Sequence, residues 1–170
     1  MPNSRLILGI DPGTALVGWG VVCQQGNKLS LRAVGCIKNT PQMPQSERLL
    51  RIYEQTTKIL AEYKPDVAAV EKLFFTKNIT TGMSVSQARG VILLTLIQSG
   101  IKLAEYGPEQ VKLSVCGYGR ADKKQVQTMV KRLLGLKEIV KPDDAADALA
   151  TAICHAQSSI LDRVKIKKKN

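Results

Sequence analysis

The stretch RLILGIDPGT, residues 5–14, joins an apolar run to an acidic turn. Its first part, RLILGI, predicts a β-strand, and two further strand-like runs follow at residues 18–24 (GWGVVCQ) and 29–38 (LSLRAVGCIK). The segments DPGT and QGNK between these runs have the composition of turns. Three successive strands joined by short turns predict an antiparallel meander at the start of the chain.

Helices and strands alternate in the rest of the sequence. Apolar side chains at helical spacing, capping-box pairs and glycine or proline stops define the segments. The expected segments are a helix over 46–63, a strand over 67–75, a helix that starts at the Ser84 and Gln87 capping box and ends at Gly100, a strand over 101–106, and helices over 108–116, 122–135 and from Pro142 onward. Strands and helices that alternate after a meander predict an α/β fold whose sheet is mixed rather than wholly parallel.

Length, composition and charge restrict the class of protein. The chain has 170 residues, of which 44% are hydrophobic, and this is enough for one domain with a sizeable core. We expect a single domain over residues 1–162 and a basic, flexible tail over 163–170 (RVKIKKKN). The formal charge of +11 would attract a polyanion such as nucleic acid or an anionic membrane surface.

The sequence lacks the patterns of membrane or secreted proteins and those of zinc-binding or disulfide-rich proteins. No apolar run approaches the roughly 20 residues of a membrane span, and the N-terminal residues do not have a signal-peptide pattern. We therefore expect a cytoplasmic protein with no membrane partner. The cysteines are widely spaced without a CxxC pair, which favours reduced thiols over a zinc site or disulfides: Cys23, Cys36, Cys116 and Cys154.

Acidic side chains occur at three places where a charge is unexpected. Asp11 ends an apolar strand in GIDPGT, Glu71 interrupts an apolar strand in VAAVEKLFF, and Asp144 and Asp147 follow Pro142 in KPDDAADALA. A carboxylate in an apolar strand must be paired or bound to a cation, because unpaired burial costs several kcal/mol. Asp144 and Asp147 are three positions apart, so they could hold a divalent cation together. Acids at a helix start also offset the helix dipole, Asp11 could cap its turn, and Glu71 could pair with an arginine, so these interpretations stay open.

Four segments give the chain a resemblance to the RuvC family of Holliday-junction resolvases, which have the ribonuclease H-like fold: LGIDPGT, VEKLFFTKN, SQARGV and DDAADALATAICH. Their order and spacing fit over nearly the whole chain. GIDPGT alone would be weak, because sugar kinases and other actin-like ATPases use a similar turn for phosphate, but those proteins need two such domains. The resemblance implies an α/β, ribonuclease H-like fold with a mixed five-stranded sheet flanked by helices. It also implies that the first and fourth strands are neighbours and that the last helix lies across them.

The resemblance assigns the catalytic and metal-binding roles to four acids: Asp11, Glu71, Asp144 and Asp147. It implies two Mg²⁺ ions per active site, with Mn²⁺ as an alternative. In such a site one ion lowers the pKa of the attacking water and the other stabilises the leaving 3′ oxygen. Asp143 does not match the family pattern and is expected to cap the last helix. His155, the only histidine, is about three turns further along and is expected to be structural.

Basic residues are frequent between Lys112 and Lys141, where they could bind phosphates beside the cut, although many could be ordinary solvated side chains. The resemblance matches Lys112 and Lys123 to positions that hold the DNA backbone. It matches Phe74 to a residue that stacks on or wedges between bases. Strand alternation turns Phe75 to the opposite side, where it would be core. The expected DNA contacts are Phe74, Lys77, Lys112, Arg120, Lys123 and Lys124.

The predicted function is the resolution of four-way (Holliday) DNA junctions by paired, metal-dependent phosphodiester hydrolysis during recombination and repair. Two cuts in strands of like polarity suit a homodimer. The apolar helix over 86–98 is the candidate dimer contact, unless it is buried within the monomer. A branch-migration complex is the expected partner. The alternatives are a ribonuclease H-like nuclease that acts on another nucleic acid and a non-cleaving junction-binding module.

Overall fold

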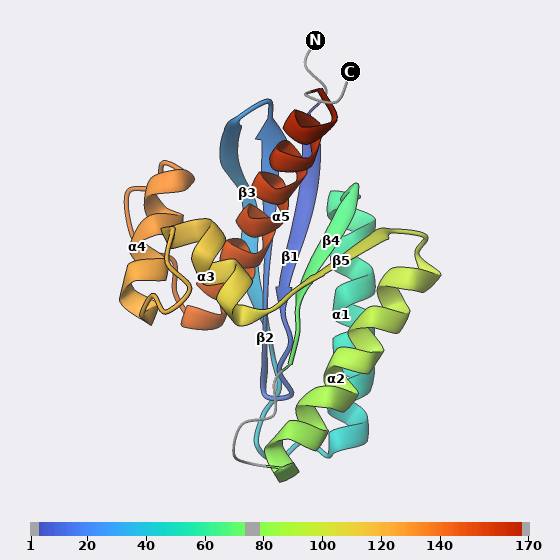
Figure 1. Cartoon of the computed structure of the whole chain (residues 1–170). Coiled ribbons are helices and arrows are strands. Elements are labelled where there is room, and N and C mark those ends of the chain that lie inside the picture. Colours follow the sequence, from blue (N-terminus) through green and yellow to red (C-terminus); the bar gives the residue numbers. More distant parts are fainter. Residues whose placement is uncertain (1–3, 74–78, 168–170) are drawn as a thin grey trace.

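The computed structural model describes residues 4–73 and 79–167 and contains one five-stranded sheet with helices on both faces (Figure 1). Its elements, in chain order, are β1 (Arg5–Asp11), β2 (Leu16–Gln25), β3 (Lys28–Lys38), α1 (Gln45–Tyr63), β4 (Val67–Glu71), α2 (Ile79–Gln98), β5 (Lys102–Tyr106), α3 (Pro108–Cys116), α4 (Lys123–Leu133) and α5 (Asp143–Lys167). The strands follow the order β3-β2-β1-β4-β5 across the sheet.

The sheet is mixed, as the sequence predicts. β1 pairs antiparallel with β2, and β2 pairs antiparallel with β3, so the predicted meander is confirmed. β4 lies parallel to β1 on its other side, and β5 lies parallel to β4. The parallel pairs are connected through α1 and α2, as crossovers between parallel strands require.

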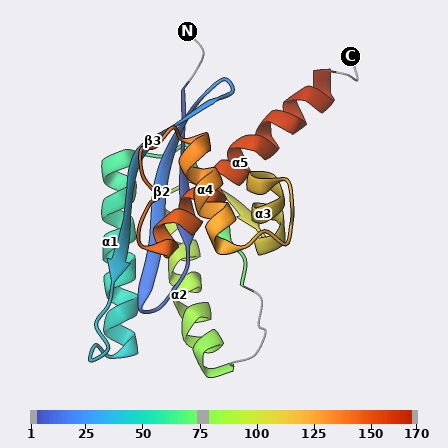
Figure 2. The ribbon, with the colours of Figure 1, turned by 90° about the vertical axis from the view of Figure 1, so that its left-hand side faces the viewer.

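The two faces of the sheet carry separate cores. Because side chains alternate along a strand, Leu8 and Ile10 of β1 face one way, with α1 and α2, whereas Ile7 faces the other way, with α3, α4 and α5. Figures 1 and 2 show the two groups of helices on opposite sides of the sheet. The chain therefore has a three-layer arrangement in which α5 is the helix that covers the centre of one face.

α5 approaches the sheet very closely because small residues meet at the contact. A β-carbon at Gly9 would collide with the carbonyl oxygen of Ala148, and one at Gly18 would collide with that of Asp144. On the helix side the contact consists of buried alanines, among them Ala145, Ala148 and Ala152. This approach fixes the start of α5 directly over β1 and β2.

Three element boundaries differ from the sequence prediction by more than two residues. β4 ends at Glu71 rather than continuing through residue 75, because its partner β5 ends at Tyr106 and the chain turns there into the proline-led α3. Residues 74 and 75 themselves lie outside the described part. Glu71 therefore ends a strand rather than interrupting one.

α2 begins at Ile79, one to two turns before the predicted start at Ser84. A capping-box pair marks one permitted start, but a helix extends upstream when the preceding residues also adopt helical geometry. The Ser86 hydroxyl donates to the Gly82 carbonyl one turn back, within that upstream part. At the other end of the chain, α5 extends to Lys167, into the stretch 163–170 where the sequence analysis expects a flexible tail.

The remaining helix predictions are confirmed closely. α3 is closed by Gly117 in left-handed conformation, and Asp122 caps α4 through a reciprocal pair of hydrogen bonds with Gln125. The four cysteines are unpaired, and Cys154 is buried, in agreement with the expected thiols. Among residues 4–73 and 79–167, no helix combines the length and apolar character needed to cross a bilayer.

Candidate active site

Asp11 and Glu71 lie side by side at the ends of neighbouring strands. β1 and β4 run parallel with Ile10 opposite Val70, so the next residue of each strand, Asp11 and Glu71, stands at the same edge of the sheet. Alternation puts both side chains on the face that α5 covers, and their carboxyl groups are hydrogen-bonded to each other. Two acids that share a hydrogen bond must also share a proton, because ionised carboxylates only accept.

The start of α5 brings two more acids to the same place. The backbone of Asp144 packs on Gly18, whose partner across the β1–β2 ladder is Asp11. Asp147 follows one turn later on the same side of the helix. We call the four acids Asp11, Glu71, Asp144 and Asp147 the acidic cluster.

The electrostatics confirm that the acidic cluster is crowded. Burial, together with the charges of Glu71, Asp147 and Asp144, raises the pKa of Asp11 to about 8. Burial and the charge of Asp147 raise the pKa of Glu71, although the hydrogen bond to Asp11 and the charge of Lys112 oppose this shift. Burial also raises the pKa of Asp147. Lys112 and Lys123 offset part of this repulsion, and without a bound cation the cluster relieves more of it by retaining a proton.

The donor set of the acidic cluster fits a hard divalent cation. All four side chains offer carboxylate oxygens, which are the ligands that Mg²⁺ and Mn²⁺ prefer. In the part of the chain that the structure describes, no three acidic, histidine or cysteine side chains are yet close enough to enclose an ion. The backbones that carry these side chains are held by the sheet and by α5. The support for a metal ion here is the chemistry of the carboxylate donors and not a complete coordination shell.

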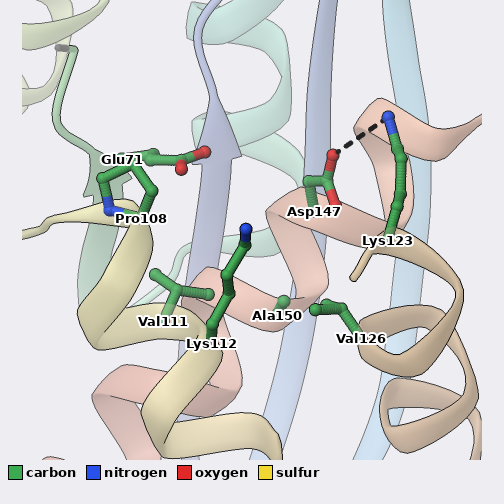
Figure 3. A pocket seen from close by; sticks show the side chains of 8 residues that line it. All are labelled: Glu71, Pro108, Val111, Lys112, Lys123, Val126, Asp147 and Ala150. Carbon is green, nitrogen blue, oxygen red and sulfur yellow. Dashed lines mark ion pairs between the residues drawn. The ribbon is translucent and has the colours of Figure 1, made fainter. Parts of the chain in front are cut away.

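A pocket of about 240 Å³ opens beside the acidic cluster. Glu71 and Asp147 line it from the sheet and α5, whereas Lys112 and Lys123 reach it from α3 and α4 (Figure 3). The Lys123 ammonium lies 3.6 Å from Asp147 Oδ2 and 3.3 Å from Asp143 Oδ2. Carboxylates and ammonium groups thus face the same space, which suits a ligand that carries phosphate next to a metal ion.

The structure brings the described candidates for DNA contact to one side of the molecule. Lys112 and Lys123 line the pocket, and Arg120 is exposed in the loop between α3 and α4. Lys124 lines a neighbouring hollow together with Tyr118, whose side chain is exposed. Phe74 and Lys77, and also Phe75, lie outside the described residues.

Two residues beside the acidic cluster, Asp143 and Arg89, make contacts that the sequence did not predict. Asp143, expected only to cap α5, accepts a hydrogen bond of 2.8 Å from Gln127 and pairs with Lys123 and Lys141. Hydrogen bonds from Lys123 and Lys141 hold its pKa below the usual range. Arg89 of α2 contacts the backbone of Glu71. An arginine within an apolar helix was the available signal for it, whereas nothing in the local pattern around Asp143 indicated its bonds to α4.

His155 lies away from the acidic cluster and has two partners of its own. Its Nε2 is 2.9 Å from Arg5 Nη2, and its Nδ1 is 2.7 Å from the Tyr106 hydroxyl. Because a guanidinium only donates, Nε2 must accept and Nδ1 carries the proton. These contacts agree with the structural role expected for this histidine.

Comparison with known proteins gives one consistent result. The family model for crossover junction endodeoxyribonuclease RuvC matches residues 7–155. The RuvC proteins of Desulfitobacterium hafniense and Thermotoga maritima are 53% and 51% identical to this chain, over 94% and 98% of its length and 97% and 99% of theirs. The structure of Thermus thermophilus RuvC in complex with Holliday junction substrate matches with a TM-score of 0.87 and 36% identity, over 93% of this chain and 96% of that one.

These matches confirm the ribonuclease H-like α/β fold that the sequence resemblance implied. They also span the segments that hold Asp11, Glu71, Asp144 and Asp147. Because both the family model and the relatives cover nearly the whole chain, this chain belongs to the RuvC family of crossover junction endodeoxyribonucleases.

Proposed function

We propose that this chain resolves four-way DNA junctions by cutting paired strands through metal-dependent phosphodiester hydrolysis. The observation that supports this most is the convergence of four carboxylates beside a lysine-lined pocket, in a chain of the RuvC family. The solved Thermus thermophilus relative is in complex with a Holliday junction substrate, and its likeness to this chain favours the same substrate here.

In this proposal Asp11, Glu71, Asp144 and Asp147 hold two Mg²⁺ ions, or Mn²⁺ in their place. When bound, such ions activate water for attack and stabilise the leaving oxygen. The protein side chains do the remaining work. The carboxylates fix the ions at the edge of the sheet, while Lys112 and Lys123 attract the scissile strand and neutralise its phosphates.

The proposed DNA surface extends from the pocket over the α3–α4 corner. Lys112, Lys123, Arg120 and Lys124 provide cations along this corner, and phosphate contacts of this kind fix the register of a nucleic acid. Phe74 is proposed as the ring that stacks on unpaired bases at the junction centre, and Lys77 as a further backbone contact. Both proposals rest on the family resemblance.

A homodimer is the proposed working form, with α2 as its contact. This helix exposes Met83, Leu94 and Ile97 on one side, although its opposite side is buried against the sheet. The small residues Ser86 and Gly90 lie on the exposed side as well, and a β-carbon at Gly90 would meet nothing within 4 Å. An apolar stripe with small residues at its centre lets a second helix approach closely. Light scattering should give twice the chain mass, and Leu94→Lys should reduce it to that of one chain.

Three further parts of the proposal rest on composition or resemblance alone. The nuclease domain is proposed to span residues 1–162, with the basic stretch 163–170 as an appended tail into which α5 continues. A branch-migration complex is the proposed partner that supplies junctions. A cytoplasmic location follows from the proposed role in DNA recombination and repair.

One digestion tests the function. The purified protein is incubated in Mg²⁺ with an end-labelled four-way junction, an RNA–DNA hybrid and a plain duplex of the same sequence. We expect symmetric nicks in the junction and no comparable cleavage of the other two substrates. Preferred hydrolysis of the hybrid would support a nuclease with another substrate, and junction binding without cleavage in either Mg²⁺ or Mn²⁺ would support a binding module.

A further inference from the structure

Arg89 is a cation in the otherwise apolar middle of α2, and it belongs to the SQARG motif. Only 20% of its side chain is exposed. Its guanidinium contacts two segments far along the chain, 18 and 16 residues away. Nε donates to the backbone carbonyl of Glu71 at 3.3 Å, and Nη2 forms an ion pair with Glu105 of β5.

The carbonyl that Arg89 binds belongs to a member of the acidic cluster. Glu71 is the last residue of β4, where the sheet ladder stops supporting the backbone. On the β5 side, the amide of Lys72 donates to the Tyr106 carbonyl at 2.8 Å. On the α2 side, Arg89 provides the hydrogen bond that holds this strand end. The backbone position of Glu71 determines where its carboxylate lies relative to Asp11.

α2 is also bonded to the turn that follows Asp11. The Thr14 hydroxyl donates to Gln45 Oε1 at 2.8 Å, and Gln45 Nε2 donates to the Ser84 carbonyl at 3.2 Å and to Gln87 Oε1 at 3.0 Å. The segment 84–89 of α2 is therefore hydrogen-bonded directly to the end of β4 and, through Gln45, to the turn that follows β1.

We propose that Arg89 is a positioning residue for Glu71, which it holds in register with Asp11 by fixing the end of β4 to α2. This inference rests on the proposed function, since it assigns Glu71 to the metal-binding set. Because α2 is also the proposed dimer helix, Arg89 connects the dimer contact to the acidic cluster.

The test compares Arg89→Gln and Arg89→Lys with the wild-type chain, using Mg²⁺ alone as the first probe. The half-saturating Mg²⁺ concentration is measured by calorimetry on the full chain without DNA. Outer-shell partners of metal ligands typically change metal affinity about 10–100-fold, so we expect Arg89→Gln to raise this concentration about ten-fold or more. Arg89→Lys keeps the charge but replaces the planar fork of N–H donors with a single ammonium, so it should recover only part of the loss and leave the Mg²⁺ midpoint about three-fold above that of wild type. Single-turnover cleavage of a four-way junction should fall in parallel, while junction affinity in Ca²⁺ stays within about two-fold.

Glu105→Gln is the matched control, because it removes the ion pair but leaves the bond from Arg89 to the Glu71 carbonyl. It should lower the melting temperature and leave the Mg²⁺ midpoint unchanged. A folded Arg89→Gln chain with a wild-type Mg²⁺ midpoint would overturn the proposal, and so would a loss of junction affinity without a change in that midpoint. If Arg89→Gln does not fold, Arg89→Lys decides, since an Mg²⁺ midpoint weakened in proportion to the cleavage rate supports positioning and an unchanged one refutes it. Failure of the wild-type chain to cut junctions would instead refute the proposed function, while the Mg²⁺ titration would still test Arg89.

Discussion

Two places on α5, one near its start and one at its middle, carry titratable groups in opposite situations. Near its start, Asp144 and Asp147 join Asp11 and Glu71, and burial is the leading cause that raises the pKa of Asp11 to about 8. Three turns later, burial is again the leading cause, with the charge of Arg5 second, and it lowers the pKa of His155 to about 4. Burial disfavours the charged form in both places, so an acid and a base shift in opposite directions.

The difference between the two places is what the neighbouring residues can supply. Neutral His155 has both ring nitrogens satisfied, one by Arg5 and one by Tyr106, so its environment is complete without a further ligand. Asp11 and Glu71, beside the start of α5, face the charges of other acids, and ionised carboxylates cannot donate to one another. His155 therefore needs no further partner, whereas the acidic cluster can accept a cation.

The largest effect on cleavage should follow from removing one negative charge from the acidic cluster. Asp11→Asn and Asp147→Asn each keep the size of the side chain but remove a carboxylate ligand. Junction cleavage should fall at least about 10³-fold, which corresponds to about 4 kcal/mol of transition-state stabilisation. Junction binding should be unchanged or tighter, because a negative charge that faces phosphate is lost. Single-turnover cleavage and gel-shift assays measure the two quantities.

Asp66→Asn is the control for that experiment. Asp66 lies just before β4, at the end of the strand opposite to Glu71, where its carboxylate accepts from the Leu6 amide at 2.7 Å. Its replacement should leave the cleavage rate within about three-fold, because an acid outside the acidic cluster holds no ion. Cleavage by Asp147→Asn within a few-fold of wild type would contradict the assignment of the acidic cluster.

Sequence patterns were sufficient where local rules decide. The strand–turn–strand pattern of residues 5–38 predicted the meander, and the Asp122–Gln125 pair predicted the start of α4. Family resemblance brought together Asp11, Glu71, Asp144 and Asp147, which composition alone left as separate capping or pairing options. Their roles in metal binding and catalysis remain predictions.

Contacts that depend on tertiary structure could not be read from the sequence. The end of β4 is set by where β5 stops pairing, and the position of α5 is set by carbonyl groups that pack on glycines of other strands. The partners of Arg89 and His155 come from distant segments, so no local window contains both members of either contact. An arginine in an apolar helix indicated that a partner must exist, but not which one.

The second prediction tests whether the start of α5 depends on its close approach to the sheet. Gly18→Val should destabilise the fold by about 3 kcal/mol or more, because the new side chain meets the backbone of Asp144 rather than a flexible side chain. Gly119→Ala is the control, since a β-carbon there meets Glu109 at ordinary contact distances of 3.6 and 4.0 Å. Urea unfolding gives both values. Equal stabilities would show that α5 is not held by this contact.

A smaller effect on stability should distinguish the acidic cluster from His155 when Mg²⁺ alone is added. Free Mg²⁺ at about ten times its dissociation constant should stabilise the wild-type fold by about 1.4 kcal/mol, seen as a higher melting temperature that EDTA reverses. The Mg²⁺-dependent increase should disappear in Asp11→Asn and persist in His155→Gln. An increase retained in Asp11→Asn would place the ion elsewhere than in the acidic cluster.

The smallest effect on stability should come from protonating His155. The folded pKa of His155, about 4, lies below the ordinary value of 6.5. Between these two pH values the unfolded chain binds a proton that the folded chain does not, so this histidine makes stability fall as pH drops from about 6.5 toward 4. Solvent reaches this half-buried side chain, which reduces the effect to about 1 kcal/mol at pH 5. The raised pKa of Asp11 acts in the opposite direction, so the difference between wild type and a variant must be measured.

We therefore expect His155→Gln to lose about 1 kcal/mol less stability than wild type between pH 7.5 and pH 5. Urea unfolding at the two pH values measures both losses. Tyr106→Phe separates titration from hydrogen bonding, because it removes the hydroxyl that faces Nδ1 and leaves the imidazole in place. It should be less stable than wild type at both pH values, with the imidazole still poorly protonated in the folded chain because burial is the leading cause of its low pKa. Its loss of stability between the two pH values should therefore stay near that of wild type. If His155→Gln instead loses as much stability as wild type over this range, His155 is protonated in the folded chain, and the contrast between His155 and the acidic cluster fails.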